Sequence, residues 1–417
     1  MTTETLLEQN TLDWPYPFYQ QLRTEAPVFY DTILGAWLVT RYEDLQQAAA
    51  LDPTLSSFMG YTQGIAPPWQ KEMEEMMWRE GYGPNNLADS VKVDPPLLAR
   101  RRSLVNQALT AEKLAPLEPA ILEMAGDLLT KLSQCNEADL LTRFSTPLPI
   151  MAMCKLMNFP TDRLDEMSSW ADSIAASVAV GIDKDTAMKH ARNICELQKF
   201  VVSTIVARRK APGTDLISQM ITARVEGDEK PQLDDKELLA MGIALIAGGL
   251  DTTRNGIAWG VFNLATQPQL FQALKRSDHQ DILLNKFIDE SLRTQTIVSH
   301  VPRYAQTDVE IGGVTVPKGS TVFLCWGSGN YDENVFPEAH QFDLERKNAR
   351  RHLTFGSGIH FCAGFRLARL EMKCAFKAVL QHFDSLELKC KPEDLPIDAS
   401  MALRGPGALP VRFTLAN

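Results

Sequence analysis

The chain has 417 residues, of which 45% are apolar and 23% are charged, and its formal net charge is −10. These values are typical of a globular protein with a sizeable core, in one large domain or in two to three smaller ones. The acidic balance argues against general nucleic-acid binding, because no overall positive charge attracts phosphates. The seven cysteines include no CxxC pair, which predicts a reducing compartment and argues against a zinc or iron–sulfur site.

Neither the first residues nor the apolar runs indicate a secreted or membrane protein. The opening, MTTETLLEQNTLDWPYPF, has no basic stretch and no apolar one, so it predicts no signal peptide. The longest strongly apolar stretch, from Met241 to Leu250, is about half as long as a membrane crossing requires. We therefore expect a cytoplasmic protein.

Hydrophobic periodicity predicts a mainly α-helical protein with minor β-sheets. No repeat, low-complexity tract or Gly/Ser linker divides the sequence, so we expect a single domain over residues 1–417. In chain order, the clearest predicted elements are a strand at Ala36–Thr40, a helix at Ala115–Leu132, a helix from Asp235 to about Ala265, a strand at Gly313–Val316 followed by a run ending at Leu324, and a strand at Pro410–Thr414.

The predicted helix from Asp235 begins with a capping signal, because Asp234 precedes it and Glu237 follows three residues later. Residues 238–247 are apolar on nearly every face, which is typical of a helix in the centre of a large domain. Two glycines and the triplet Asp-Thr-Thr at 251–253 then follow, and both are unfavourable inside a core helix. Alone, that triplet would more often be a cap or a turn, but local rules are commonly broken at functional sites.

A second anomaly is one cysteine among glycines. Residues 355–364 read FGSGIHFCAG and precede a helix-like segment, with Cys362 close to its start. Glycine permits unusual dihedral angles and close backbone approach, and a cysteine near a helix N-terminus gains thiolate character. Considered alone, such a cysteine would more often be a buried residue beside a tight turn.

This segment resembles, at every fixed position, the haem-binding signature FGxGxHxCxG of the cytochrome P450 family, whose bacterial members are soluble haem-thiolate monooxygenases. The resemblance implies the P450 fold, with haem b between the central helix and the cysteine loop. It makes Cys362 the iron ligand and His360 a partner of a haem propionate. The remaining contacts that it implies with the cofactor fall on Phe355, Gly356, Gly364, Ala247 and Gly248.

Two further pairs match the family. Glu290 and Arg293 resemble its ExxR pair, which braces the cysteine loop; their i, i+3 spacing lets the side chains meet on one helix face. Without the resemblance they would be an ordinary surface ion pair. Asp251 and Thr252 resemble the acid–alcohol pair of the oxygen-binding helix, which would make them catalytic because dioxygen cleavage consumes protons.

Arg102 and Arg303 match the family's two propionate-binding arginines, which make charge-assisted contacts. Two positions depart from the family pattern. Leu98 stands where histidine is frequent, so one propionate contact is expected to be missing or to come from elsewhere. Gln341 replaces the arginine that joins the ExxR pair in many relatives; its amide can donate a hydrogen bond but carries no charge.

The resemblance implies a monooxygenase that inserts one atom of O2 into a hydrophobic small molecule, such as a terpenoid, steroid, fatty acid or aromatic compound. No flavin, nicotinamide or iron–sulfur motif is present, so electrons are expected from a separate ferredoxin-type donor with its reductase. An acidic donor would meet a basic patch on the cysteine side of the haem. The residues expected in that patch are Arg100, Arg101, Arg366, Arg369 and Lys373.

The substrate pocket is expected, by family analogy, to include the segments 57–92, 169–182 and 297–301. Its predicted contacts are Ala244, Ala247, Gly248, Thr252, Val298, Ser299 and Met401. Two other functions stay open. A peroxide-driven haem-thiolate enzyme would use hydrogen peroxide without a redox partner, but such relatives usually replace the acid–alcohol pair with arginine and proline. A haem-binding or sensor protein without enzymatic activity would need neither Asp251 nor Thr252.

Overall fold

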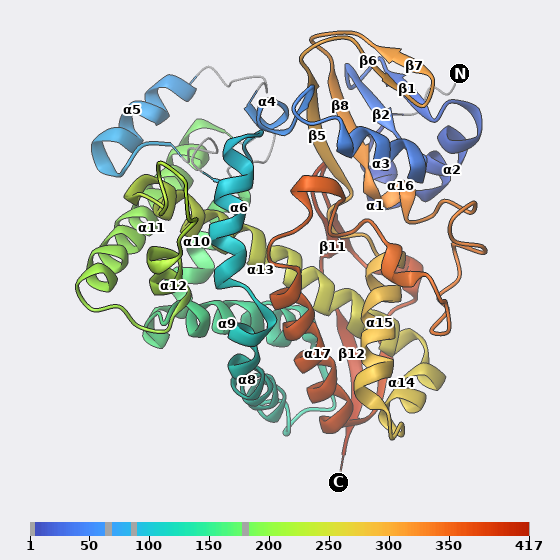
Figure 1. Ribbon diagram of the computed structural model, residues 1–417. Helices are drawn as coiled ribbons and strands as arrows, with labels where there is room; N and C mark the ends of the chain where they lie inside the picture. The colour runs from blue at the N-terminus through green and yellow to red at the C-terminus, as the bar shows by residue number, and fades with distance from the viewer. Residues whose placement is uncertain (1–4, 63–68, 85–89, 177–182, 417) are drawn as a thin grey trace. The chain divides into compact units, whose positions relative to one another are not determined.

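The computed structural model describes residues 5–62, 69–84, 90–176 and 183–416, which fold into two compact units (Figure 1). The first unit comprises Met1–Tyr61, Glu118–Leu148 and Thr252–Asn417. The second comprises Thr62–Leu117 and Pro149–Asp251. Each unit is therefore built from segments that are far apart in the sequence.

The first unit contains all the strands that the structure describes, in four sheets. A five-stranded sheet has the order β1 (Val28–Asp31), β2 (Ala36–Val39), β8 (Thr321–Cys325), β5 (His300–Ala305) and β3 (Leu55–Ser56). A three-stranded sheet has the order β4 (Glu137–Asp139), β12 (Pro410–Leu415) and β9 (Phe383–Leu388). Two hairpin-like pairs are β6 (Val309–Ile311) with β7 (Val314–Val316), and β10 (Ile397–Ala399) with β11 (Arg404–Pro406).

Helices surround these sheets in the first unit and make up most of the second. Those of the first unit are α1 (Gln9–Asp13), α2 (Tyr16–Glu25), α3 (Tyr42–Ala50), α4 (Ser57–Thr62), α8 (Glu118–Thr130), α14 (Pro268–Lys275), α15 (Gln280–Thr294), α16 (Trp326–Gly329) and α17 (Phe365–His382). Those of the second are α5 (Gln70–Glu80), α6 (Leu97–Ala108), α7 (Ala111–Leu114), most of α9 (Pro147–Met157), α10 (Leu164–Ala176), α11 (Lys184–Lys210) and α12 (Leu216–Thr222). The long helix α13 (Asp235–Thr266) begins in the second unit and ends in the first (Figure 1).

Small residues let α13 lie close to α17 in the first unit. A Cβ atom at Gly260 would stand 2.1 Å from the ring of Phe376, and one at Gly256 would stand 2.9 Å from the sulfur of Met372. Side chains at either glycine would therefore force the two helices apart. The glycines of this half of α13 bring it against the helix that follows the cysteine loop.

The elements predicted from the sequence are confirmed, with ends that shift by a few residues. The predicted helix at 115–132 is α8, preceded by a 3₁₀ turn at Ala115–Leu117, and the predicted strands are β2, β7, β8 and β12. The capping box at the start of α13 is present. The amide of Asp234 donates to Glu237 Oε2 at 3.1 Å, and the amide of Glu237 donates to Asp234 Oδ1 at 2.8 Å.

Helix α13 is nevertheless not covered on every side. Gly248 is exposed, and Ala244, Leu245, Ala247, Gly249, Asp251 and Thr252 are partly buried, whereas Ile243, Ile246 and Leu250 are buried. Five of these positions, Ala244, Ala247, Gly248, Asp251 and Thr252, follow the i, i+3, i+4, i+7, i+8 spacing of one helix face, which we call the uncovered stripe. The apolar sequence predicted that every face of the helix is buried. The tertiary structure instead leaves this stripe less buried than the rest of the helix.

Candidate active site

The cysteine loop is shaped by glycines with left-handed backbone conformations. Gly356 and Gly358 have φ angles of +76° and +69°, which residues with a side chain rarely adopt. The loop closes through the amide of Cys362, which donates to the carbonyl of Phe355 at 2.8 Å. Gly364 then occupies the N-cap of α17. This turn chemistry places the thiol of Cys362 just before the first turn of a long helix.

Cys362 differs from the buried cysteines of the chain in its surroundings. It is half-buried, whereas Cys154, Cys325 and Cys374 are buried. Burial raises the pKa of the Cys154 thiol to about 11 and that of Cys374 to about 12, so both stay protonated at neutral pH. Cys325, on β8, has its pKa raised further by complete burial. These buried thiols are poor ligands, because only a thiolate binds metal well.

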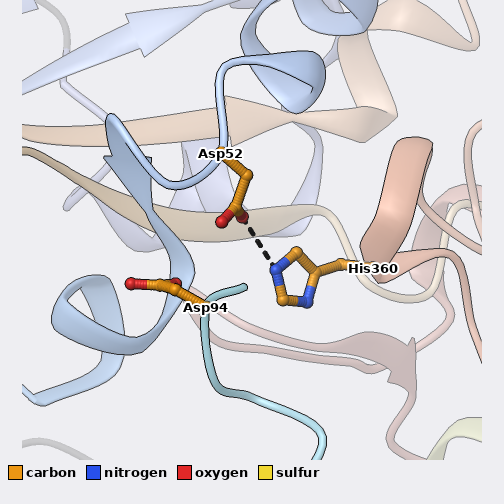
Figure 2. A group of neighbouring side chains, drawn as sticks. All are labelled: Asp52, Asp94 and His360. Carbon is orange, nitrogen blue, oxygen red and sulfur yellow. Dashed lines mark hydrogen bonds and ion pairs between the residues drawn. The ribbon is translucent and has the colours of Figure 1, made fainter. Parts of the chain in front are cut away.

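His360 lies two residues before Cys362 and is held by a carboxylate of the first unit (Figure 2). Its Nε2 atom lies 2.8 Å from Asp52 Oδ2, just beyond the end of α3. The backbone is close here too, since a Cβ atom at Gly358 would stand 2.9 Å from the carbonyl oxygen of Ala49. The loop therefore packs on the end of α3. Because Nε2 is paired with Asp52, Nδ1 is the ring atom of His360 that can contact a second carboxylate.

Glu290 and Arg293 form a completely buried ion pair on α15. The guanidinium of Arg293 donates to both carboxylate oxygens of Glu290, at 2.7 and 2.8 Å. It also donates to the carbonyls of Asn330, Ala339 and Gln341 at 3.0, 2.7 and 3.0 Å. One arginine thus connects α15 to the segment that leads into the cysteine loop.

The loop itself is tied to this region through Asn330 and Thr354. Asn330 Nδ2 donates to Thr354 Oγ1 at 2.9 Å, and the amide of Leu353 donates to Asn330 Oδ1 at 2.6 Å. Thr354 in turn donates to the carbonyl of Leu292 at 2.6 Å. Glu290, Arg293 and these residues make a continuous hydrogen-bonded support directly before Phe355. Such buried networks are rigid when every polar group is satisfied.

The charge that Gln341 cannot bring to the ExxR pair comes from another arginine. Arg346, five residues further on, donates from Nε to Glu290 Oε1 at 2.9 Å. The amide of Asp343 donates to the same oxygen at 3.0 Å. Gln341 contributes its backbone carbonyl, which accepts from Arg293 and Arg346. Arg346 therefore takes the place of the arginine that many relatives carry at position 341. The folded path of this segment determines which arginine reaches Glu290, and alignment of the sequence alone does not.

The predicted basic patch is wrong for two of its five members. Arg100 and Arg101 are buried in the second unit and both donate to Glu237, at 2.8 and 3.0 Å. Burial raises the pKa of Glu237, but hydrogen bonds from Arg100, Asp234, Lys230 and Arg101 outweigh it and lower the pKa. These arginines therefore neutralise the capping glutamate of α13.

The other members of the patch lie on α17 and differ in exposure. Arg369 is ion-paired with the buried carboxylate of Asp289, which also faces His352. Lys373 pairs with Glu118 and Asp281, at 3.3 Å from each. Arg366 is exposed, with its guanidinium 4.5 Å from the ring centre of Phe365. Exposed positive charge at the start of α17 is thus concentrated at Arg366.

The arginines predicted to bind propionates lie on different elements. Arg303 is buried on β5 and donates to the carbonyl of Pro302 at 3.0 Å. Arg102 is half-buried on α6, and Leu98, one turn before it, is completely buried. Leu98 thus belongs to the core of the second unit.

Two segments predicted to line the substrate pocket run side by side in the first unit. Val298 forms an isolated antiparallel bridge with Leu403, and the amide of Arg404 donates to the carbonyl of Ile297 at 2.8 Å. Ser299 is buried, and Met401 lies in the turn before Leu403. Of the other predicted segments, residues 63–68, 85–89 and 177–182 lie outside the described residues.

Two buried polar residues were not singled out by the sequence analysis. His300, at the start of β5, hydrogen-bonds to the turn that carries Met401, and Glu371, on α17, is a buried carboxyl group. A glutamate in a helix that is otherwise apolar on that face was a visible signal for Glu371. No local pattern marks His300. Among the described residues, no helix combines the length and the apolarity that crossing a membrane requires.

Comparison with known proteins agrees with this geometry. The family model for cytochrome P450 matches residues 83–409. The 6-deoxyerythronolide B hydroxylase of Saccharopolyspora erythraea is 33% identical over 422 residues, covering 99% of this chain and 100% of the relative. The vitamin D(3) 25-hydroxylase of Pseudonocardia autotrophica is 30% identical, covering 95% of this chain and 93% of the relative.

A solved structure has the same fold. Cytochrome P450 CREJ, in complex with (4-ethylphenyl) dihydrogen phosphate, superposes with a TM-score of 0.86 at 27% identity. The match covers 97% of this chain and 98% of that structure. With the family model spanning most of the sequence and the relatives spanning nearly all of it, the chain belongs to the cytochrome P450 family of haem-thiolate monooxygenases.

Proposed function

We propose that this P450 hydroxylates a large, mainly apolar molecule, of the macrolide or steroid kind, with electrons from a ferredoxin-type protein. The relatives named above act on 6-deoxyerythronolide B and vitamin D3, which are both large and mainly hydrophobic. The observation that carries the proposal is the uncovered stripe of α13, which presents Ala244, Ala247 and Gly248 beside the acid–alcohol pair Asp251-Thr252. Small side chains on that stripe leave room for a bulky guest.

The residues present suit haem b. Apart from the flanking residues and the helix's own backbone, no atom of the described residues lies within 4 Å of the position that a Cβ would take at Gly248 or at Gly364, so both positions leave room for a flat group. The thiol of Cys362 supplies the ligand that this haem requires. Arg303, Arg102 and His360 supply cationic or donor groups for its two carboxylates. When bound, the haem supplies the activation of dioxygen.

The chain's own residues divide the remaining work. Cys362 binds the iron as a thiolate, and the Glu290–Arg293–Arg346 network keeps its loop in place. Thr252 holds a hydrogen-bonding hydroxyl at the reaction site, and the carboxyl group of Asp251, adjacent on α13, passes protons to it from solvent. Phe355 packs beside the cofactor and shields the sulfur from water. Val298, Ser299 and Met401 form one wall against the substrate.

A ferredoxin-type donor would dock near the start of α17. Arg366 is exposed there, and Arg350 and Arg351 are exposed on the 3₁₀ turn at Ala349–Arg351, just ahead of the cysteine loop. Three cations close together in sequence around the loop attract an acidic partner despite the net charge of −10. Arg366→Glu should slow reduction and weaken its salt dependence, and Arg209→Glu, on α11, is the matched control.

The central test compares Thr252→Ala with Thr253→Ala, since Thr253 is the adjacent buried threonine of α13. The probes are 6-deoxyerythronolide B and vitamin D3, with a ferredoxin and its reductase supplying electrons. We expect Thr252→Ala to consume electrons at a normal rate while product falls about tenfold or more, because proton delivery contributes factors of about 10²–10⁴. Thr253→Ala should keep the coupling of the wild type. Unchanged coupling in Thr252→Ala would contradict the assignment.

A further inference from the structure

The imidazole of His300 is buried between a tyrosine hydroxyl and a backbone carbonyl. Its Nδ1 atom lies 2.9 Å from the carbonyl oxygen of Met401, and its Nε2 atom lies 2.5 Å from the hydroxyl oxygen of Tyr19. Tyr19, on α2, is completely buried. All three residues belong to the first unit, so one ring connects α2, β5 and the turn before β11.

The hydrogen bonds of this ring are fixed by its partners. The carbonyl of Met401 can only accept, so Nδ1 carries a hydrogen. Burial lowers the pKa of His300 to about 4, so the ring is neutral near pH 7 and Nε2 must accept. Burial also raises the pKa of Tyr19, whose hydroxyl therefore keeps its proton and donates it to Nε2. Each ring nitrogen thus has one partner of the required kind.

His300 adds a side-chain attachment to the expected pocket wall. Side chains alternate along a strand, so His300 faces the side of β5 opposite to Val301 and Arg303. The backbone pairing of Val298 with Leu403 holds one end of the Met401 turn against the segment before β5. The ring of His300 holds the turn again at Met401 itself. The turn is therefore attached twice, once by the backbone bridge at Leu403 and once by the side chain of His300 at Met401.

We propose that Tyr19 and His300 are positioning residues that determine substrate size selectivity, by keeping the Met401 turn close to the segment 297–300. Neither residue touches the substrate; both act through the carbonyl of Met401. The inference rests on the proposed function only in placing Val298, Ser299 and Met401 in the pocket wall. Without the ring, the turn keeps its backbone attachment but moves outward at Met401. Large ligands then gain more binding affinity than small ones.

Azoles of different size test this in the holoenzyme, because their nitrogen binds haem iron whatever the natural substrate is. The measurement is the ratio of the spectral dissociation constant of clotrimazole to that of imidazole. The variants are His300→Leu, which loses both hydrogen bonds, Tyr19→Phe, which loses one, and His300→Asn, whose amide can still donate to Met401. The matched control is Tyr331→Phe, whose buried hydroxyl donates to the carbonyl of Thr294 at 2.9 Å.

We expect His300→Leu to lower the ratio about threefold to tenfold, the effect of losing one hydrogen bond, and Tyr19→Phe to lower it less. His300→Asn and Tyr331→Phe should stay within about twofold of the wild type. If His300→Leu fails to bind haem, a lowered ratio in Tyr19→Phe together with a normal ratio in His300→Asn supports the proposal.

Equal ratios in all variants that bind haem would overturn the proposal. So would a ratio in Tyr331→Phe that falls as far as that of Tyr19→Phe, because any loosened core contact would then explain the effect. A protein that hydroxylates neither 6-deoxyerythronolide B nor vitamin D3 would still give these azole ratios. Failure of the proposed function is thereby distinguished from failure of this inference.

Discussion

Glu290 and Glu371 are two buried glutamates on α15 and α17, with side-chain environments that differ completely. Both residues are almost inaccessible, at 0% and 2% exposure. Glu290 accepts hydrogen bonds from Arg293, Arg346 and the amide of Asp343. Glu371 Oε2 has no hydrogen-bond partner among the residues that the structure describes. The same side chain thus contacts two cations in one place, whereas in the other place one of its carboxylate oxygens has no partner among the described residues.

This difference teaches how the protein tolerates a buried carboxyl group. A buried carboxylate is stable only when cations and donors replace the water it has lost. Glu290 has two guanidinium groups for this purpose, and the arrangement fixes the segment before the cysteine loop. For Glu371, burial raises the pKa well above the ordinary value and favours the protonated, neutral form. Glu290 therefore stabilises the fold, whereas burial of Glu371 lowers the free energy of unfolding.

Removing the charge of Glu290 should have the largest effect on the free energy of unfolding. Glu290→Gln removes the charge that compensates Arg293 and Arg346 while keeping the shape of the side chain. We expect a loss of about 3–5 kcal/mol in the free energy of unfolding, because two buried cations lose their counter-ion. Urea unfolding and the Soret absorbance of the purified protein measure the outcome. A loss below about 1 kcal/mol would show that the network is not structural.

A third buried group, His300, sharpens the comparison, because it too is neutralised by burial. The unfolded chain protonates this ring below pH 6.5, whereas the folded chain does so only near pH 4. Stability contributed by the neutral ring is therefore complete above pH 6.5 and falls by about 3 kcal/mol between pH 6.5 and 4. His300→Asn should remove this part of the slope in urea unfolding across that range. An unchanged slope would contradict the assignment.

Replacing Arg346, the second cation at Glu290, should lower the free energy of unfolding by a smaller amount than Glu290→Gln. Arg346→Gln should cost about 2 kcal/mol, the value of one charge-assisted hydrogen bond in a buried site. Adding Gln341→Arg to that variant should restore part of the loss, because the backbone of residue 341 already accepts a hydrogen bond from Arg293, next to that carboxylate. Thermal unfolding of the single and double variants measures this. A double variant as unstable as the single one would mean that Arg346 acts through its carbonyl contacts instead.

Glu371→Gln should have the smallest effect at low pH and a growing one as pH rises. At pH 4 the variant and the wild type should agree within about 0.5 kcal/mol, because the wild-type side chain is then neutral in the folded chain and largely neutral in the unfolded chain. Above the ordinary pKa of glutamate, the unfolded wild type ionises and the folded one does not, so wild-type stability falls with rising pH. The variant should lack this fall and be the more stable protein at pH 8. Parallel stability curves from pH 5 to 8 would refute a protonated Glu371.

Much of the candidate site could be predicted because it depends on neighbours in the sequence. The loop around Cys362 is set by glycines that alone adopt its positive φ angles, and the start of α13 is set by a capping box four residues long. The Glu290–Arg293 pair follows from helix geometry at i, i+3. In each case the interacting groups lie within about one turn of chain, so periodicity and turn chemistry determine them.

Only the tertiary structure decided which distant groups meet. It assigned Arg346 rather than Gln341 to Glu290, buried Arg100 and Arg101 against Glu237, and joined Tyr19 to His300 across 281 residues of sequence. It also decided that one stripe of the apolar helix α13 stays uncovered. Such partners are selected by close packing of whole helices and strands, which depends on the volume of every side chain between them, and no local pattern contains that information.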